Sequence, residues 1–185
     1  MAQNYTLSRN KVGLILVDVQ ERLFGYVERP CEVLDTLQKL IQGFQIMHLP
    51  IVVTEQYPQG LGSTILALKN CLGEQQKYLT KTTFSCMGDP EIHDYIIGLP
   101  IDQWVVVGIE AHVCVLQTVK DLLAIGKQVA VLNDAITSRS IYDFSTAIAE
   151  MQQLGVRVTS TETVLFELIR DSKAPEFKAI SQLVK

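Results

Sequence analysis

The sequence predicts an α/β domain in which a parallel sheet carries helices on both faces. Apolar runs of strand length alternate with amphipathic stretches of helix length along the chain. The apolar runs are nearly continuous, which is typical of strands buried on both faces. Right-handed crossovers then place helices on either side of the sheet. No repeat, low-complexity tract or composition shift marks a linker, so we expect a single domain over residues 1–185.

The elements of the first half follow from local patterns. The first strand is VGLILVDV, which carries Asp18 near its end. A helix over about residues 32–48 is indicated by apolar residues at helical spacing, namely Val33, Leu37, Leu40, Ile41 and Phe44. Pro50 introduces the strand IVVT, and the Gly- and Pro-rich segment EQYPQGLGST after it indicates a loop. A short strand, KYLT, runs up to Lys81.

The second half repeats the alternation. Pro90 stands at the first position of a predicted helix, EIHDYIIG. The buried strand WVVVGI is followed by a helix over about residues 112–124, for which Gly126 is a candidate C-cap. The strand VAVLND, a helix over about residues 143–154 and the strand VRVTS come next. Two final helices, TVLFELIRD and PEFKAISQLVK, complete the prediction.

Composition narrows the function classes. Hydrophobic residues make up 48% and charged residues 19%, enough for a substantial core. The net charge is −4 and no Lys/Arg stripe occurs, so nucleic acid is not an expected partner. No apolar run reaches transmembrane length, and the first residues lack the apolar stretch of a signal peptide. We therefore expect no membrane partner. The four cysteines form no CxxC pair, so we expect reduced thiols and a cytoplasmic location.

Three chemically reactive residues follow strands at one expected edge of the sheet. Asp18 ends the first strand, Lys81 ends the short third strand, and Cys114 lies just beyond the strand at 104–109. In open α/β sheets, functional groups collect beyond the carboxyl ends of the strands. These side chains are therefore the candidate catalytic residues, with Cys114 as the nucleophile.

Together these side chains permit nucleophilic catalysis. A free thiol has a pKa of about 8.5, so little of it is the reactive thiolate at neutral pH. The first turn of a helix and a nearby ammonium would both favour the thiolate of Cys114. Asp18 can accept the thiol proton and return it to a leaving amine. Backbone amides between Gly108 and Cys114 could form an oxyanion hole.

Each residue taken alone also has a simpler explanation. Asp18 could cap a turn, Lys81 could be a solvated charge, and Cys114 could be a buried helix residue. Only their joint position favours catalysis. His112 is a poor base for Cys114, because side chains two positions apart on a helix diverge, so we prefer Asp18. We expect the remaining cysteines to be structural, and these are Cys31, Cys71 and Cys86.

Three separated segments resemble a known family. They are LVDVQ with Asp18 and Gln20, LTKTTFS with Lys81, and GIEAHVCVLQT with Cys114. In this order they resemble the isochorismatase-like cysteine hydrolases, a superfamily that includes nicotinamidases and N-carbamoylsarcosine amidases. TEQYPQGLGST, KTTFSC and GIEAHVC are most similar to the isochorismatase domain-containing protein 2 branch. The similarity runs from about residue 11 to residue 184.

The resemblance implies a three-layer Rossmann-like fold with a six-stranded parallel sheet and a triad of Asp18, Lys81 and Cys114. It also implies a non-proline cis peptide bond between Ile109 and Glu110. This bond would turn an amide toward the oxyanion, so the backbone amides of Glu110 and Cys114 are the expected oxyanion hole. The family's dimers and larger oligomers imply a homo-oligomer, either a dimer or a tetramer. Arg139 could serve such an interface, or it could simply be solvated.

The sequence departs from parts of the superfamily. Nicotinamidases bind a metal through an aspartate and histidines after the second strand, whereas TEQYPQGLGST contains no histidine. We therefore expect no metal and no cofactor, and not nicotinamide as the substrate. Glu110 stands where many amidases have a small residue, and it could contact the substrate or join a hydrogen-bond network. The candidate pocket residues are Gln20, Phe24, Tyr57, Phe84 and Glu110, and the aromatic ones could equally be packing residues.

The predicted function is hydrolysis of a small amide- or carbamoyl-type substrate through a covalent thioester on Cys114. Retention of a cysteine favours acyl chemistry over the enol ether cleavage of isochorismate that also occurs in the superfamily. The alternative is a catalytically silent interaction or regulatory protein that keeps the hydrolase fold.

Overall fold

The computed structural model describes residues 5–185 and is built on a six-stranded parallel sheet. The strand order is β3-β2-β1-β4-β5-β6, which confirms the predicted α/β class and the six strands. The strands are β1 (Val12–Val17), β2 (Ile51–Gln56), β3 (Tyr78–Lys81), β4 (Gln103–Ile109), β5 (Gln128–Thr137) and β6 (Arg157–Thr159).

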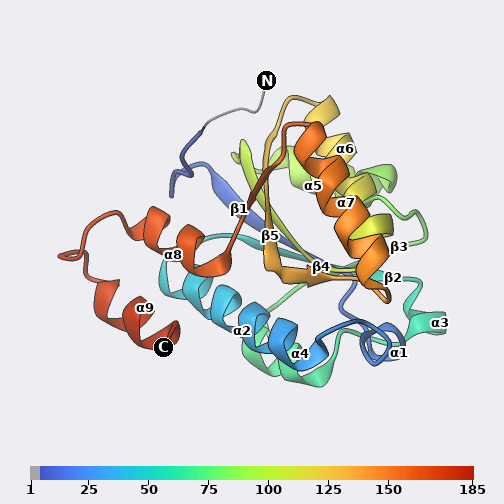
Figure 1. The fold of residues 1–185 in the computed structure, drawn as a ribbon, viewed down its shortest axis with the longest axis horizontal. Coiled ribbons are helices and arrows are strands. Elements are labelled where there is room, and N and C mark those ends of the chain that lie inside the picture. The colour runs from blue at the N-terminus through green and yellow to red at the C-terminus, as the bar shows by residue number, and fades with distance from the viewer. Residues whose placement is uncertain (1–4) are drawn as a thin grey trace.

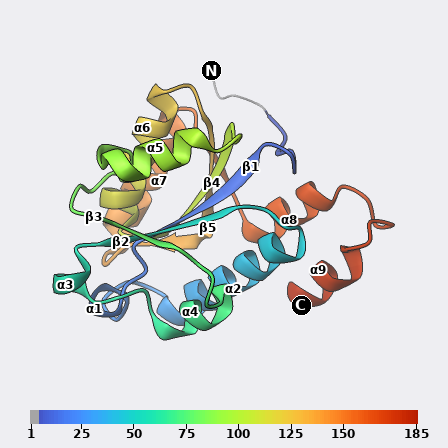
Figure 2. The same ribbon diagram turned by 180° about the vertical axis from the view of Figure 1, so that it is seen from behind.

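Helices cover both faces of the sheet, as the crossover rule predicts. In Figure 1, helices α2, α4, α8 and α9 lie on one face and α5, α6 and α7 on the other, and Figure 2 shows the same layers from behind. The helices are α1 (Glu21–Phe24), α2 (Pro30–Ile46), α3 (Pro58–Leu61), α4 (Leu66–Leu72), α5 (Pro90–Gly98), α6 (Leu116–Ala124), α7 (Ile141–Gln153), α8 (Thr161–Ile169) and α9 (Phe177–Leu183). A 3-10 turn, η1 (Cys86–Gly88), and a π-helical turn, η2 (Ala111–Val115), complete the set.

The two central strands, β1 and β4, form the middle of the core. Every residue of both strands is buried, because helices cover the sheet on each side. The Trp104 ring packs so closely on β1 that a Cβ at Gly13 would lie 2.6 Å from a ring carbon. Each fully buried aliphatic side chain contributes about 1.5–3 kcal/mol relative to its exposed state. The continuous apolar runs of the sequence therefore correspond to these strands.

The strand order reverses between β1 and β4, and this reversal determines where a site can form. From β1 the chain moves outward to β2 and β3, then crosses back to pair β4 with the other side of β1. The crossovers leave in opposite directions from β1 and β4, and in open α/β sheets ligands bind beyond the carboxyl ends of the strands at such a point. At this point Val17 pairs with Gly108. Gly108 has φ +131°, and a Cβ there would lie 2.2 Å from the Val17 carbonyl oxygen.

The structure corrects several boundaries. The predicted loop EQYPQGLGST continues β2 through Gln56 and contains the short helix α3, while α1 and α4 were not predicted. The predicted helix at 112–124 is divided into η2 and α6. Strand β5 continues past Asp134 to Thr137, because an irregularity opposite Val106 and Gly108 lets it pair again with the end of β4. Residues 138 and 139 therefore reach the same edge as the site.

Two predicted helix signals are confirmed. Pro90 begins α5, and the Asp89 side chain accepts hydrogen bonds from the Glu91 and Ile92 amides. Gly126 follows α6 with φ +81° and donates to the Leu123 carbonyl, as expected after a helix C-terminus.

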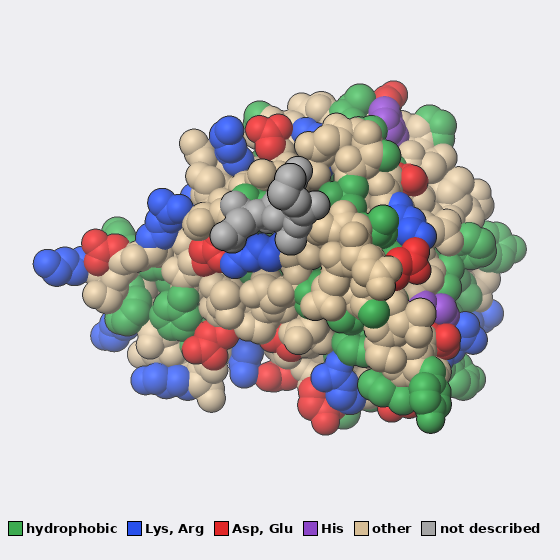
Figure 3. All heavy atoms as spheres, turned by 45° about the horizontal axis from the view of Figure 1, so that its top comes forward, with side chains coloured by type: hydrophobic (Ala, Val, Ile, Leu, Met, Phe, Trp, Pro, Cys, Tyr) green, Lys and Arg blue, Asp and Glu red, His purple; other side chains and the backbone are tan. Residues whose placement is uncertain are grey.

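The surface gives little indication of a single type of partner. Figure 3 shows acidic and basic side chains interspersed over the face that it displays. Within residues 5–185, none of the helices combines the length and the apolar character needed to cross a bilayer.

Candidate active site

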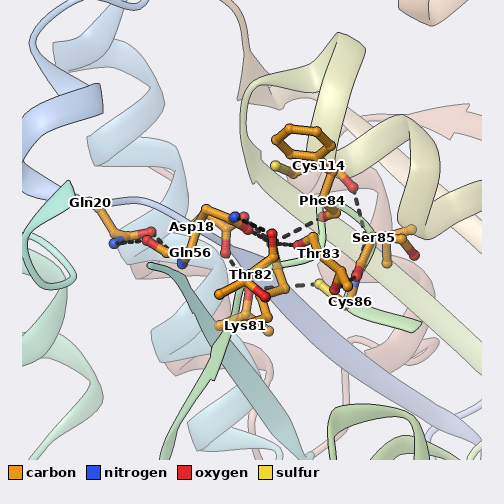
Figure 4. A network of polar contacts seen from close by, with 12 residues as sticks. Asp18, Gln20, Gln56, Lys81, Thr82, Thr83, Phe84, Ser85, Cys86 and Cys114 are labelled. Carbon is orange, nitrogen blue, oxygen red and sulfur yellow. Dashed lines mark hydrogen bonds and ion pairs between the residues drawn. The ribbon is translucent and has the colours of Figure 1, made fainter. Parts of the chain in front are cut away.

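The carboxyl edge of the sheet brings together the three residues that the sequence analysis selected. Asp18 directly follows β1, Lys81 is the last residue of β3, and Cys114 lies in η2 immediately after β4. Figure 4 shows the Asp18–Lys81 contact and the position of Cys114 relative to it.

Asp18 and Lys81 form a buried ion pair. Lys81 Nζ lies 2.6 Å from Asp18 Oδ2, and the side chains are 0% and 1% exposed, respectively. Thr54 on β2 donates to the other carboxylate oxygen, Asp18 Oδ1, at 2.8 Å. Burial is the largest single effect and would lower the pKa of Lys81, but the charge and hydrogen bond of Asp18, together with the neighbouring Cys86 and Cys114, outweigh it and the pKa is raised overall. Lys81 is therefore a fixed positive charge at neutral pH.

Cys114 lies under the influence of the same carboxylate. It is 6% exposed, and the negative charge of Asp18 acts on its thiol. Its pKa is raised, first because the thiol is buried and then because Asp18 is negatively charged, while Lys81 acts in the opposite direction. This corrects the expectation of a stabilised thiolate: the resting side chain is a protonated thiol next to a carboxylate base.

The backbone before Cys114 turns sharply without a cis peptide bond. Throughout residues 5–185 every peptide bond is trans, so the cis bond expected between Ile109 and Glu110 is absent. Glu110 instead adopts a left-handed conformation, with φ 55° and ψ 55°, and begins the turn η2. Asp18 after β1 and Tyr57 after β2 are also left-handed, with φ 53° and 35°. Such conformations are costly for non-glycine residues and are often found at functional sites.

Glu110 belongs to a hydrogen-bond network, which was one of the alternatives considered for it. Its carboxylate contacts the Arg139 guanidinium twice, at 3.1 Å from Nε and 3.3 Å from Nη2. The Glu110 side chain is 10% exposed and that of Arg139 is 59% exposed. Arg139 is thus held at the rim of the site by an ion pair.

His112 makes its polar contacts away from the thiol. Its Nδ1 lies 3.0 Å from Ser138 Oγ. Its Nε2 lies 3.9 Å from carboxylate oxygens of both Glu110 and Asp143. This placement agrees with the choice of Asp18 over His112 as the base.

The candidate pocket residues differ in how exposed their side chains are. Gln20 is completely buried and its amide is taken up by backbone groups of Gln56 and Gly62, so it can position the backbone. Phe24 is half-buried against the core, whereas Tyr57 and Phe84 are more than half exposed. A cavity of about 200 Å³ opens beside Lys81 and is lined by Tyr57, Pro58, Gln59, Thr80, Lys81, Thr82 and Asp89.

The sequence analysis missed several side chains that hold the site together. Gln56 Oε1 accepts a hydrogen bond from Lys81 Nζ at 2.7 Å. The Thr118 hydroxyl accepts from Cys86 N at 2.9 Å and donates to Cys114 O at 2.7 Å, so it ties η1 to η2. The TEQ triplet at the end of β2 was a possible signal for Gln56, because it ends at the same edge as Asp18. Thr118 gave no signal, since its role depends on how two distant turns meet.

The other cysteines lie in different environments. Cys86 is fully buried with Sγ 3.7 Å from Thr54 Oγ1, and burial together with the charge of Asp18 raises its pKa to about 11. Cys31 is exposed and Cys71 is partly buried. Within the described residues, no group of three or more His, Cys, Asp or Glu side chains is arranged to hold a metal ion.

Comparison with known proteins identifies relatives over most of the chain. Residues 12–163 match the family model of the isochorismatase domain. The chain is 36% identical over 169 residues to isochorismatase domain-containing protein 1 of Danio rerio, covering 91% of this chain but 59% of that protein. It is 37% identical to isochorismatase domain-containing protein 2 of the same species, covering 96% and 89%. It is also 36% identical to the secreted isochorismatase effector Isc1 of Phytophthora sojae, covering 93% and 83%.

Solved structures agree with the fold. A structure named as MAR1 ribonuclease from Caenorhabditis elegans superposes with a TM-score of 0.91 at 37% identity, covering 97% of this chain and 92% of that one. The YcaC gene product of Escherichia coli, described as an octameric hydrolase of unknown specificity, superposes with a TM-score of 0.90 at 19% identity, covering 98% and 90%. The second likeness supports the fold alone.

Proposed function

Because the chain belongs to the isochorismatase family, we propose that it is a hydrolase in which Cys114 attacks a small amide- or carbamoyl-type substrate. The main support is the position of Asp18, which contacts the Lys81 ammonium at 2.6 Å and whose charge acts on the Cys114 thiol. A single carboxylate is thus held next to both a nucleophile and a fixed positive charge.

In the proposed first half-reaction, Asp18 removes the thiol proton as Cys114 Sγ bonds to the substrate carbonyl carbon. The carbonyl π electrons move to oxygen, and backbone amides of Glu110 and Cys114 are the candidate donors to that oxyanion. Protonated Asp18 then gives its proton to the leaving amine as the C–N bond breaks. A thioester on Cys114 and a free amine result.

The second half-reaction uses the same groups in reverse. Asp18 takes a proton from water as the water oxygen attacks the thioester carbonyl, and the C–S bond breaks. The proton returns to sulfur, which restores the neutral thiol and releases the acid. Lys81 keeps its charge throughout and stabilises the negative charge that develops near Asp18 and Cys114.

The raised pKa of Cys114 fits this sequence of steps. The proton stays on sulfur until a carbonyl group is close enough for concerted transfer to Asp18. We assign the exposed aromatic side chains of Tyr57 and Phe84 to the pocket wall, together with the partly buried Phe24. Glu110 holds the Arg139 guanidinium at the rim of the pocket through their ion pair.

Assembly and location are proposed from the relatives and the cysteines. We propose a homo-oligomer, either a dimer or a tetramer, as the resemblance to the family implies; analytical ultracentrifugation tests this. A cytoplasmic location is proposed because the four cysteines are free. The Phytophthora relative is named as secreted, so fractionation of cells that make the protein is the deciding measurement.

A second candidate activity comes from the Caenorhabditis elegans structure that is named a ribonuclease. RNA cleavage would not require a thioester, so a single variant can distinguish the two activities. We expect Cys114→Ser to lose amide hydrolysis. RNA cleavage that persists in Cys114→Ser and in wild type alike would favour the ribonuclease assignment and count against ours.

The test is a screen of small amides and carbamoyl compounds against wild type, Cys114→Ser and the matched control Cys31→Ser. Intact-mass spectrometry after rapid acid quenching should show an acyl adduct on wild type and on Cys31→Ser. No adduct and no turnover in Cys114→Ser is the expected result. Full turnover in Cys114→Ser would refute the covalent mechanism, and no turnover by wild type across the screen would favour the catalytically silent interaction protein.

A further inference from the structure

The Lys81 ammonium has three hydrogens, and acceptors surround it on every side. Asp18 Oδ2 lies at 2.6 Å and Gln56 Oε1 at 2.7 Å. The carbonyl oxygens of Phe84 and Thr83 lie farther away, at 3.0 and 3.2 Å. Two hydrogens are accounted for by the two short contacts, and the third is shared between the carbonyls. Gln56 therefore holds one of the three hydrogens by itself.

The orientation of the Gln56 amide is fixed from its other end. Its Nε2 donates to the Thr82 carbonyl at 2.8 Å, so its Oε1 must face Lys81. A flipped amide would place two N–H groups against an ammonium and two oxygens against each other. The contact is therefore specific for an acceptor at this position.

The Gln56 backbone is held by a second buried amide, that of Gln20. Gln20 Oε1 accepts from Gln56 N at 2.7 Å, and Gln20 Nε2 donates to Gln56 O at 2.9 Å and to Gly62 O at 2.7 Å. The side chain of Gln20 thus pairs with both the N–H and the C=O of one residue of β2, as a neighbouring strand would. Figure 4 shows Gln20, Gln56 and Lys81 in this order.

We propose that Gln56, locked in place by Gln20, is a positioning residue that fixes the Lys81 ammonium against Asp18 and leaves the buried ion pair electrically neutral. The proposal rests on the catalytic role proposed for Cys114, and it goes beyond the triad by assigning two further residues. Gln56 supplies an oxygen acceptor without charge, so Asp18 stays the only carboxylate within residues 5–185 that contacts Lys81.

The charge balance matters because few ionisable groups surround the thiol. The groups that act on Cys114 are Asp18, Lys81 and Cys86. A carboxylate at position 56 would place a second negative charge on Lys81, and the pKa of Cys114 would rise further. A leucine there would leave one hydrogen of a buried ammonium without its acceptor and let Lys81 shift away from Asp18.

The experiment measures the rate of Cys114 alkylation by iodoacetamide between pH 6 and 11, read from the Cys114 peptide by mass spectrometry. Gln56→Glu should move the midpoint up by about one pH unit, which is about a tenfold loss of rate at pH 8. Gln56→Leu should move it in the same direction, and Gln20→Leu by less. The matched controls Gln75→Glu and Gln75→Leu, at an exposed loop position, should leave the profile unchanged.

Simple loosening of the structure predicts the opposite sign. It would expose the thiols, so Cys114 and the fully buried Cys86 would both react faster at every pH. Faster alkylation in the Gln56 variants, or an unchanged midpoint, would overturn the positioning role. The readout needs no substrate, so this result is independent of the amide screen: absent hydrolysis refutes the proposed function, and an unmoved midpoint refutes the role of Gln56.

Discussion

Asp18 accepts a hydrogen bond from Lys81 at 2.6 Å in a place that solvent does not reach, and the charge of the same carboxylate raises the pKa of the buried Cys114 thiol. The proposed base, Asp18, and the positive charge that stabilises negative charge near it, that of Lys81, are therefore in direct contact. Changing either residue should alter the properties of the thiol in a direction that the arrangement determines.

Replacing Asp18 by Asn should separate thiol ionisation from catalysis. After burial, the charge of Asp18 is the largest cause of the raised pKa of Cys114, so removing that charge should lower this pKa. Asn tolerates the left-handed conformation that Asp18 adopts, with φ 53°. We expect alkylation of Cys114 to begin at lower pH while hydrolysis falls by a hundredfold or more, on the order of the loss of a general acid–base. An alkylation profile displaced to higher pH would contradict this.

Replacing Lys81 by Met should destabilise the fold strongly. The substitution leaves a buried carboxylate without its partner, which costs on the order of 3–5 kcal/mol. Lys77→Met is the matched control, because Lys77 contacts Glu91 at the surface and exposed ion pairs contribute little. Urea denaturation should give a much lower midpoint for Lys81→Met than for the control, and equal midpoints would show that the pair is not important for stability.

Gly108→Ala should be severe although it adds a single methyl group. The backbone there has φ +131°, and the new Cβ would lie 2.2 Å from the Val17 carbonyl oxygen. We expect a loss of about 3 kcal/mol or more, or no folded protein. Gly98→Ala is the control, because nothing lies within 4 Å of its Cβ position at the end of α5. Thermal melting distinguishes them, and similar melting temperatures would contradict the close approach.

Glu167 should contribute to stability in a pH-dependent way. Burial alone would raise its pKa, but hydrogen bonds from Arg157 and from the Leu7 amide lower it below the ordinary 4.5. The stabilisation is therefore complete above pH 4.5 and is lost as the pH falls through the lower folded-state pKa. Wild type should exceed Glu167→Gln in unfolding free energy by a constant amount from pH 7 to 5, and the gap should shrink below pH 4. A gap that widens on acidification would be the wrong sign.

Local patterns in the sequence were sufficient for the sheet and for the edge of the site. Buried strands such as β1 appear as continuous apolar runs, and the strand-end rule placed Asp18, Lys81 and Cys114 together. The state of the thiol was not predictable, because the pKa of Cys114 depends first on how deeply the thiol is buried and then on the balance between the opposite charges of Asp18 and Lys81. Gln56 and Thr118 were missed for a related reason. Their hydrogen bonds join turns that are distant in the sequence, and no periodicity records such contacts.

The complete enclosure of the Lys81 ammonium has a consequence for how substrates arrive. Its charge is matched by Asp18 and its hydrogens all point into the protein, so it projects almost no field into the surrounding solution. Encounter with a small molecule should then depend on diffusion and shape, and the association rate should change little between dilute buffer and physiological ionic strength.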